Sequence, residues 1–449
     1  MKKTLALIAL LLGASVAHAQ DTHYWNLQYG TRGELLGGMV VGSALDMSST
    51  FYNPGSLARV ENPSSILTAS IFGLQTVKVV DKDVDQEAVA AQTFGPLPSM
   101  IAGVLPMKWF GGRTAYSFLT RRQFDFRMVA REGAVIGRDV PGDTLSVGGE
   151  VILDQRLSEQ WGGFTWAKGV GGNTSIGATL YGVYRGQYTR RSQTVEALSS
   201  SGYGAALAYV NEVDFWDARV LAKAGVYTVF AGANVGLAFT TPSASLFGTG
   251  EVMSNQSLIG DADGNGTDDS AAQIAYGKDL STEYRSPFSV ALGASRQFKR
   301  LAAHATVEYF ASIDDYTVLH APAPASSPGV TGVDVTYGNA AAEVFNWGLG
   351  LEQGFNEQST AYVSFIADRS SHASVAGRNI TLSTWDIYHV NGGVAFAIGS
   401  SELTIGGGLA WGKNKVDTQS YEGIGLLPPT VVPGGAGYSQ LKFIIGFAL

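Results

Sequence analysis

Residues 33–58 read GELLGGMVVGSALDMSSTFYNPGSLA and match neither a regular helix nor a regular strand. Glycines at positions 33, 37, 38 and 42 weaken a helix, and Asn53-Pro54-Gly55 ends any regular element. The stretch nevertheless carries too many apolar side chains for an exposed linker, namely Leu35, Leu36, Met39, Val40, Val41 and Leu45. Such a segment needs an enclosure, and we expect the rest of the chain to supply one.

The first residues have the pattern of a removable secretory signal. Lys2-Lys3 precede an apolar run from Leu5 to Leu12, and Ala17-His18-Ala19 supplies an A-x-A cleavage site. We therefore expect residues 1–19 to be a signal peptide. The chain has no cysteine, which excludes thiol chemistry, a lipid-modified cysteine and a disulfide framework.

The composition favours a membrane barrel over a soluble protein. Charged residues make up 15% of the chain, whereas about 25% is usual, and its 57 glycines are about twice the usual share. Nineteen tyrosines and eight tryptophans supply rings of the kind that gather at membrane interfaces. Beyond the signal no run of about 18 apolar residues remains, which excludes a helical membrane protein. A net charge of −8 does not support a nucleic-acid partner.

From residue 64 onward the chain reads as long strands with apolar residues on one parity and small or polar ones on the other. Phe345, Trp347 and Leu349, for example, alternate with asparagine and glycine. An apolar band opposite weakly polar residues is typical of a membrane barrel, with a secreted β-sandwich as the alternative. We expect fourteen strands, at residues 64–74, 98–108, 113–130, 145–169, 174–190, 214–228, 232–241, 284–298, 302–317, 342–354, 358–371, 384–398, 402–414 and 437–449.

The connections between these strands alternate between tight turns and long loops, as in bacterial outer-membrane barrels. We predict the long loops at 75–97, 131–144, 191–213, 242–283, 318–341, 372–383 and 415–436. The last strand is apolar at every second position up to Leu449, which resembles the signal read by the barrel-assembly machinery. The fold class is therefore an all-β membrane protein, a 14-stranded antiparallel transmembrane β-barrel. We expect residues 20–62 to form a hatch, or plug, inside the lumen of a barrel made by residues 63–449.

Three stretches resemble the outer-membrane long-chain fatty-acid and hydrocarbon transporters, the FadL and toluene-uptake family. They are GMVVGSALDMSSTFYNPGSLA from Gly38, VGLAFTTPSASLFGTGEV from Val235 and YRSPFSVALGASRQF from Tyr284. The resemblance covers nearly the whole mature chain and aligns the family's Asn-Pro-Ala plug signature with Asn53, Pro54 and Gly55. Glycine in place of alanine is expected to keep the turn and loosen the start of the next helix. The resemblance implies uptake of hydrophobic compounds through a hatch-gated barrel in the outer membrane of a Gram-negative bacterium.

Candidate site residues come from the hatch, the lumen and the long loops. For the hatch we predict a tight turn at Asn53-Pro54, with gating positions Gly42, Asp46, Asn53, Pro54 and Gly55; Asp46 either pairs with a lumen cation or is solvated. Strand parity turns several cations into the lumen, where one could hold a carboxylate ligand or belong to a structural network. The possible ligand-binding residues are Arg185, Arg219, Lys223, Leu246, Phe247 and Leu258.

Residues 261–269 resemble the oxygen-rich half of an EF-hand loop, with candidate ligands Asp261, Asp263, Asn265 and Asp269. The bidentate glutamate expected at the last position is Ala272, so either weak Ca²⁺ binding or an acidic surface turn fits. No histidine lies in a pattern typical of barrel phospholipases, and no G-x-S-x-G occurs, which disfavours an enzyme. The alternative to transport is a structural or adhesive surface barrel. The expected partners are a hydrophobic small molecule, outer-membrane lipid and the assembly machinery, with the protein acting as a monomer.

Overall fold

The computed structural model describes residues 22–43, 45–61, 65–81, 89–137, 144–200, 202, 204–261, 266–375, 378–380, 385–399, 401–414, 419–421, 430–432 and 434–448. The predicted signal peptide lies outside these residues. Among the described residues, no helix is long and apolar enough to cross a membrane.

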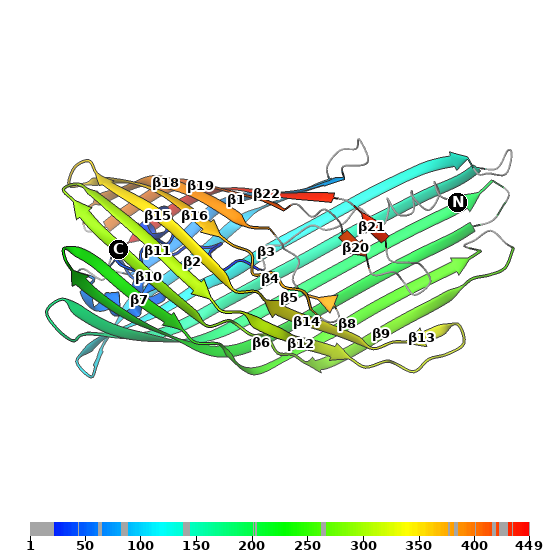
Figure 1. The fold of residues 1–449 in the computed structure, drawn as a ribbon, viewed down its shortest axis with the longest axis horizontal. Coiled ribbons are helices and arrows are strands. Elements are labelled where there is room, and N and C mark those ends of the chain that lie inside the picture. The colour runs from blue at the N-terminus through cyan, green and yellow to red at the C-terminus, as the bar shows by residue number, and fades with distance from the viewer. Residues whose placement is uncertain are drawn as a thin grey trace.

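Fourteen strands of the main sheet form a closed antiparallel barrel (Figure 1), so this prediction is confirmed. Closure comes from the first and last strands, which pair from Ile66 with Ala448 to Asp81 with Gly434. Both ends of the barrel chain therefore lie beside the short turns. The barrel strands are β1 Ile66–Asp81, β2 Val89–Trp109, β3 Gly112–Gly137, β4 Thr144–Gly169, β5 Thr174–Ser199, β6 Gly204–Phe230, β7 Ala233–Thr240, β10 Ser289–Phe298, β11 Leu301–Phe310, β15 Val344–Gly354, β16 Ser359–Asp368, β18 Ile387–Ile398, β19 Ser401–Asn414 and β22 Gly434–Ala448.

The wall of the barrel is much taller on one side than on the other (Figure 1). Strands β3 to β6 are 26 or 27 residues long, whereas β10, β11, β15, β16 and β18 have 10 to 12. The short strands have the length that crosses a bilayer. We call β3–β6 the tall wall, and β10, β11, β15, β16 and β18 the short wall.

Several predicted long loops are instead strands, and these predictions were wrong. Residues 75–97, 131–144 and 191–213 are largely occupied by the ends of β1 to β6, and residues 242–283 hold β8 Ala244–Gly260 and β9 Ala271–Ser281. β8 continues β7 along β6 after residues 241–243. β-Pairing continues past the membrane because the backbone hydrogen bonds of a ladder do not depend on lipid.

A smaller sheet lies against the inner face of the tall wall. It consists of β12 Ile313–Ala321, β14 Val335–Ala341 and β17 Arg378–Asn379. Val318, Leu319 and Tyr337 of this inner sheet pack in one buried cluster with Phe215 of β6 and Val252 of β8. The predicted loop 318–341 is therefore partly a sheet. Three short strands complete the fold, β13 Val330–Gly332, β20 Gln419–Tyr421 and β21 Thr430–Val432.

Outward-facing residues of the short wall are apolar, as the alternation predicted. Leu292 and Leu349 are 50% and 56% exposed, while their inward neighbours on the strand are buried. Phe345 lies near the start of the 11-residue strand β15 and Phe355 directly after its end, and both are exposed. Aromatic rings separated by this length are expected at the two interfaces of a membrane.

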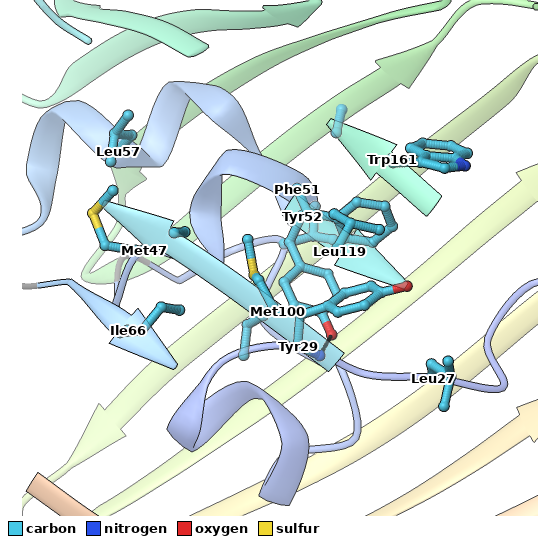
Figure 2. Close-up of a cluster of buried hydrophobic side chains, with 14 of the residues drawn as sticks. Leu27, Tyr29, Met47, Phe51, Tyr52, Leu57, Ile66, Met100, Leu119 and Trp161 are labelled. Carbon is cyan, nitrogen blue, oxygen red and sulfur yellow. Dashed lines mark hydrogen bonds between the residues drawn. The ribbon is translucent and has the colours of Figure 1, made fainter. Parts of the chain in front are cut away.

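The N-terminal segment, residues 22–61, lies inside the barrel at its short-turn end (Figure 1). It folds into three short helices, α2 Thr31–Leu35, α3 Ser49–Tyr52 and the 3₁₀ helix η1 Pro54–Arg59. Met47, Phe51 and Leu57 pack with Leu119 and Trp161 of the wall in one apolar cluster (Figure 2). The apolar residues that ruled out an exposed linker are thus buried by the barrel.

Candidate functional site: a lumen cavity above the N-terminal segment

Glycines of the wall let the N-terminal segment approach backbone to backbone. A Cβ built on Gly236 would lie 1.8 Å from the carbonyl oxygen of Val41, and one on Gly225 would lie 2.1 Å from Oδ1 of Asn53. The segment has matching glycines, because a Cβ on Gly42 or Gly55 would lie 2.6 Å from wall backbone. Side chains are excluded on both sides of the contact.

Asn53 fixes the turn at the centre of this contact. Its Nδ2 donates to the carbonyl oxygens of Val41 at 2.9 Å and Val226 at 3.0 Å, and its Oδ1 accepts from the N–H of Gly55 at 3.1 Å. Asn53 is fully buried. All three bonds join the turn either to the segment itself or to strand β6, so Asn53 attaches the segment to the wall.

Polar contacts tie the segment to strands around the whole lumen. They include the Arg32–Glu402 ion pair at 2.7 Å, Lys442 Nζ donating to Gln28 Oε1 at 2.9 Å, Arg113 donating to the carbonyls of Leu57 and Val60, and Ser43 Oγ 2.9 Å from His304 Nδ1. These partners come from β19, β22, β3 and β11. The segment is therefore held at several points of the barrel's circumference.

A cavity lies between the N-terminal segment and the inner sheet. About 50 Å³ of it is open to the centre of a water molecule, enough for a few waters and far below the roughly 300–1,000 Å³ of typical ligand pockets. A hydrocarbon therefore enters only if lining groups move. The lining comes from the segment (Thr22, Tyr24, Phe51), the wall (Arg121, Arg122, Glu159, Trp161, Leu221, Lys223, Thr240, Ser289, Glu308, Phe310), the β9–β10 linker (Tyr284, Arg285, Ser286, Pro287), the inner sheet (Ile313, Asn339, Ala340, Ala341) and Ser371.

Two buried cations on the cavity wall rest on aromatic rings. The guanidinium of Arg121 lies 5.3 Å from the ring centre of Phe51 and 5.7 Å from that of Trp161, and Lys223 Nζ lies 4.4 Å from Phe51. Within the described part of the chain, neither cation is in an ion pair. Both charges are thus available to an anionic group in the cavity.

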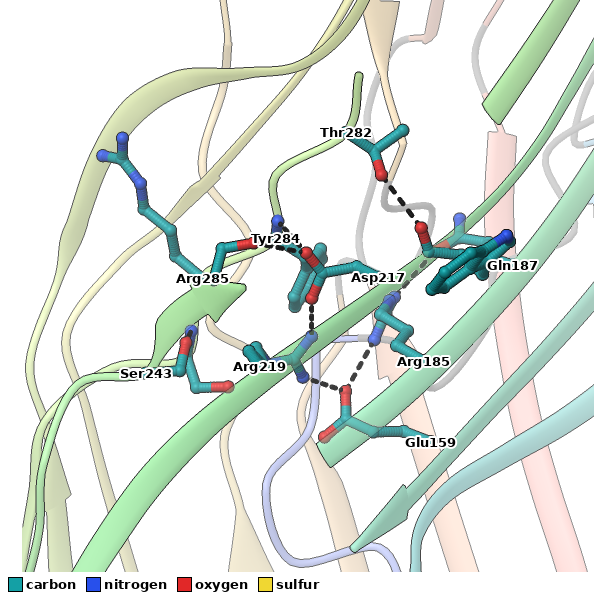
Figure 3. Close-up of polar contacts among 12 residues, drawn as sticks. Glu159, Arg185, Gln187, Asp217, Arg219, Ser243, Thr282, Tyr284 and Arg285 are labelled. Carbon is teal, nitrogen blue, oxygen red and sulfur yellow. Dashed lines mark hydrogen bonds and ion pairs between the residues drawn. The ribbon is translucent and has the colours of Figure 1, made fainter. Parts of the chain in front are cut away.

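Arg185 and Arg219, in contrast, belong to a buried ion network. Glu159 Oε2 lies 3.1 Å from Arg185 and 2.7 Å from Arg219, and Arg219 also pairs with Asp217 at 3.0 Å (Figure 3). The ring of Tyr284 lies beneath both guanidiniums, 3.9 Å from Arg185 and 4.8 Å from Arg219. Of the three cations predicted to hold a ligand, Lys223 alone lines the cavity, while these two position Tyr284.

No family model and no curated protein sequence matches the chain. Solved structures do. A Pseudomonas aeruginosa FadL homologue has a TM-score of 0.60 and 14% identity over 95% of this chain and 99% of its own. The Pseudomonas putida toluene transporter TodX (TM-score 0.54, 13% identity) and the Ralstonia pickettii toluene transporter TbuX (0.53, 13%) are each matched over 98% of their length and cover 94% of this chain.

The chain has the fold of the FadL-type channels. At this level of identity the likeness concerns the fold alone.

The remaining predicted residues lie at different places in this FadL-type fold. Leu246 and Phe247 of β8 are 58% and 62% exposed, whereas Leu258 is buried. Asp46 accepts from the N–H of Ser48 at 2.7 Å, within the N-terminal segment.

Of the predicted calcium ligands, Asp263 and Asn265 lie outside the described residues. Asp261 accepts from the N–H of Gly266 at 2.7 Å, and the carbonyl of Gly260 accepts from the N–H of Asp269 at 3.0 Å. No group of three or more metal-binding side chains occurs among the residues that the structure describes.

Arg121, Arg122 and Trp161 were not predicted as site residues. Trp161 could have been found from parity, because it occupies an inward position of β4. The two arginines could not, because adjacent residues of a regular strand face opposite sides. The β3–β4 register shifts between Thr120 and Arg122, and both arginines are only 8% exposed.

Proposed function

We propose that the protein is an outer-membrane channel for the uptake of hydrophobic compounds, with the N-terminal segment as its hatch. The observation that carries the proposal is the cavity directly above Phe51, where Arg121 and Lys223 lie on aromatic rings inside a closed barrel. The lining combines apolar rings with charged groups of both signs, and its two cations that are in no ion pair among the described residues, Arg121 and Lys223, suit an amphipathic molecule with an anionic head, such as a long-chain fatty acid. The solved relatives are described as a FadL homologue and as toluene transporters, which supports the substrate class.

The hatch is proposed to exclude ions while the cavity holds the substrate. Backbone contact at Gly225 and Gly236 leaves no space for a side chain between hatch and wall. A bound molecule needs more room than the cavity offers, so binding favours a displaced hatch. The turn at Asn53-Pro54 is the part of the hatch that such a displacement separates from β6.

We place the exit in the wall beside β2. The β2–β3 register shifts between Leu105 and Lys108, around Pro106, which cannot donate a ladder hydrogen bond. A hydrophobic substrate is stable in lipid, so an exit into the bilayer needs no aqueous channel.

We further propose a Gram-negative outer-membrane location, a monomer assembled by the barrel-assembly machinery, and no enzymatic activity. The solved relatives described as transporters support the last point. Ser43, His304 and Glu352 lie in series, at 2.9 and 3.5 Å, in an order that resembles a hydrolase triad. Ser43 is buried where the N-terminal segment contacts β11, so these contacts are better explained as an attachment of the hatch to the wall.

Uptake of labelled oleate and toluene by host cells that lack their own channel tests the proposal, together with ion conductance in planar bilayers. The wild-type protein should import oleate and conduct ions poorly. Deletion of residues 21–58 should give a conducting pore without selective uptake. Arg121→Met combined with Lys223→Met should lower oleate uptake more than toluene uptake, because toluene has no charge to neutralise. A wild-type rate equal to that of cells without the protein, or an unchanged deletion variant, would refute the proposal.

A further inference from the structure

The barrel wall is interrupted where the short wall meets the tall wall. The ladder between β7 and β10 ends at the pair Thr240–Ser289, and the ladder between β8 and β9 begins at Thr249–Ser281. The residues between these pairs, 241–248 on one strand and 282–288 on the other, are all described. Hydrogen bonds join the two stretches at two places. Ser243 and Ser286 bond each other, and the N–H of Thr282 donates to the carbonyl of Gly248.

The β9–β10 linker, residues 282–288, is drawn into the lumen at this interruption. Tyr284 is 5% exposed, with Arg185 and Arg219 over its ring, and its N–H donates to Asp217 Oδ2 at 3.3 Å (Figure 3). Burying the charged side chains of this network, Glu159, Arg185, Asp217 and Arg219, costs desolvation free energy, which their mutual pairing offsets. The inward course of the linker is therefore fixed by a specific network.

The lumen cavity reaches this interruption. Its lining includes Thr240 and Ser289, the last paired residues of β7 and β10, and Arg285, Ser286 and Pro287 of the linker. The side chain of Arg285 is 46% exposed and pairs with Glu283 at 2.7 Å, and its guanidinium lies 4.6 Å from the ring centre of Tyr316. One residue thus borders both the cavity and the outside.

On the outside, aromatic rings flank the interruption. Phe247 pairs with Ala218 of β6 and has no ladder partner on the β9–β10 side; its ring lies 5.8 Å from Trp216, which stacks on Tyr184 at 6.0 Å. Phe288, at the other edge, is 37% exposed. Rings of this kind on a barrel's outer face mark the boundary between acyl chains and head groups. The interruption is therefore at the height of the outer leaflet's head groups.

We infer that the interruption is a lateral entrance, through which an amphipathic compound with an anionic head passes from the outer leaflet into the cavity. The head displaces Glu283 from Arg285 while the chain slides between Phe247 and Phe288. This inference rests on the proposed function and adds the route of the substrate. Compounds that partition into lipid then reach the cavity without first entering water above the barrel.

A disulfide across the interruption tests the entrance. Ser243 Oγ accepts from the N–H of Ser286 at 2.8 Å, and the chain has no cysteine, so Ser243→Cys with Ser286→Cys offers one possible disulfide. The matched control is Val235→Cys with Ala294→Cys, a directly opposed pair of the same two strands where the ladder is intact. Oleate uptake is compared between the oxidised and reduced forms of each full-length variant in cells. Heat-modifiable migration on gels checks that each barrel is folded.

Oxidation should lower uptake by the Ser243→Cys, Ser286→Cys variant to the rate of cells without the protein, and dithiothreitol should restore it. The control should not respond to oxidation. Ser286→Trp, which fills the interruption without a crosslink, should also lower uptake. Equal uptake by the oxidised and reduced forms would overturn the entrance while the proposed function stands. If the wild-type protein imports no oleate, the proposed function fails, and the entrance fails with it.

Discussion

The two halves of the barrel along its axis differ in how closely their interiors are packed. Beside the short turns, the N-terminal segment packs against wall glycines and a continuous apolar cluster. Beyond the membrane-crossing strands, the lumen contains an ion network and a separate inner sheet. Both halves contain apolar clusters and polar contacts, but the first half is packed backbone to backbone, whereas the second half surrounds a cavity with a buried ion network.

This difference matches what each half does in the proposed channel. Close packing of backbone and apolar groups excludes water and ions, and a volume change of one methylene group already affects the stability of such a core. Charged pairs fix a few atoms precisely and leave neighbouring space unfilled, at a cost in desolvation. A seal is thus built from the first kind of contact, and an adjustable binding space from the second.

The largest effect is expected from breaking the ion network with Glu159→Gln. This change leaves Arg185 and Arg219 without their shared partner, and removing one member of a buried pair costs about 3–5 kcal/mol. The matched control is Glu150→Gln on the same strand, which breaks the exposed pair with Arg131 and should cost about 0–1 kcal/mol. Free energies of unfolding in urea, measured in detergent, provide the comparison. Equal losses for the two variants would contradict a structural role for the network.

The height of the two walls predicts a second difference. Leu349→Arg puts a charge on the lipid face of the short wall, where we expect a cost of about 2–4 kcal/mol. Thr194→Arg puts the same charge on the exposed face of the tall wall, ten residues above Tyr184, and should change stability little. Unfolding from lipid vesicles is the measurement. A large loss for Thr194→Arg would mean that the tall wall lies within the membrane.

Adding one methyl group tests whether the close packing of the N-terminal segment against the wall seals the lumen. Gly236→Ala puts a Cβ 1.8 Å from the carbonyl of Val41, so the segment must move, at about 1–3 kcal/mol. Gly182→Ala is the control, because its Cβ would meet nothing nearer than 4.0 Å. We expect raised ion conductance in planar bilayers for Gly236→Ala alone. Unchanged conductance would show that the contact does not seal the lumen.

The barrel could be predicted from the sequence because lipid imposes a simple alternation. Phe345, Trp347 and Leu349 face lipid, so the alternation of apolar residues predicted both the outward face and the presence of this strand. The ends of the tall wall were missed because that alternation fades above the membrane. Around Arg190 and Glu196, the outward positions carry charges, which sequence reasoning assigns equally well to a loop.

The site was predicted only in part, for a local reason. Lys223 follows the regular parity of β6 and was predicted to face the lumen. Arg121 and Arg122 both face the lumen because of a register shift, which cannot be predicted from the residue pattern. Whether a lumen cation is free or paired depends on side chains from other strands, as with Glu159 of β4 and Arg219 of β6. Such pairing across distant segments follows from the closed barrel and cannot be seen in one strand.

The smallest expected effect concerns calcium at the connection between β8 and β9. Asp261, Asp263, Asn265 and Asp269 supply oxygen ligands without the bidentate glutamate of an EF-hand, so we predict a Kd on the order of 10⁻⁴–10⁻³ M. Titration calorimetry of the purified protein should show Ca²⁺-dependent heat that Asp261→Ala with Asp263→Ala removes. Asp214→Ala, an exposed carboxylate lower on the tall wall, is the control and should keep that heat. Because the loop is far from the cavity along β8, chelating Ca²⁺ should leave oleate uptake unchanged. Absence of heat in the wild-type protein would identify the loop as an acidic surface turn, and the contrast between the dense and adjustable halves would stand without it.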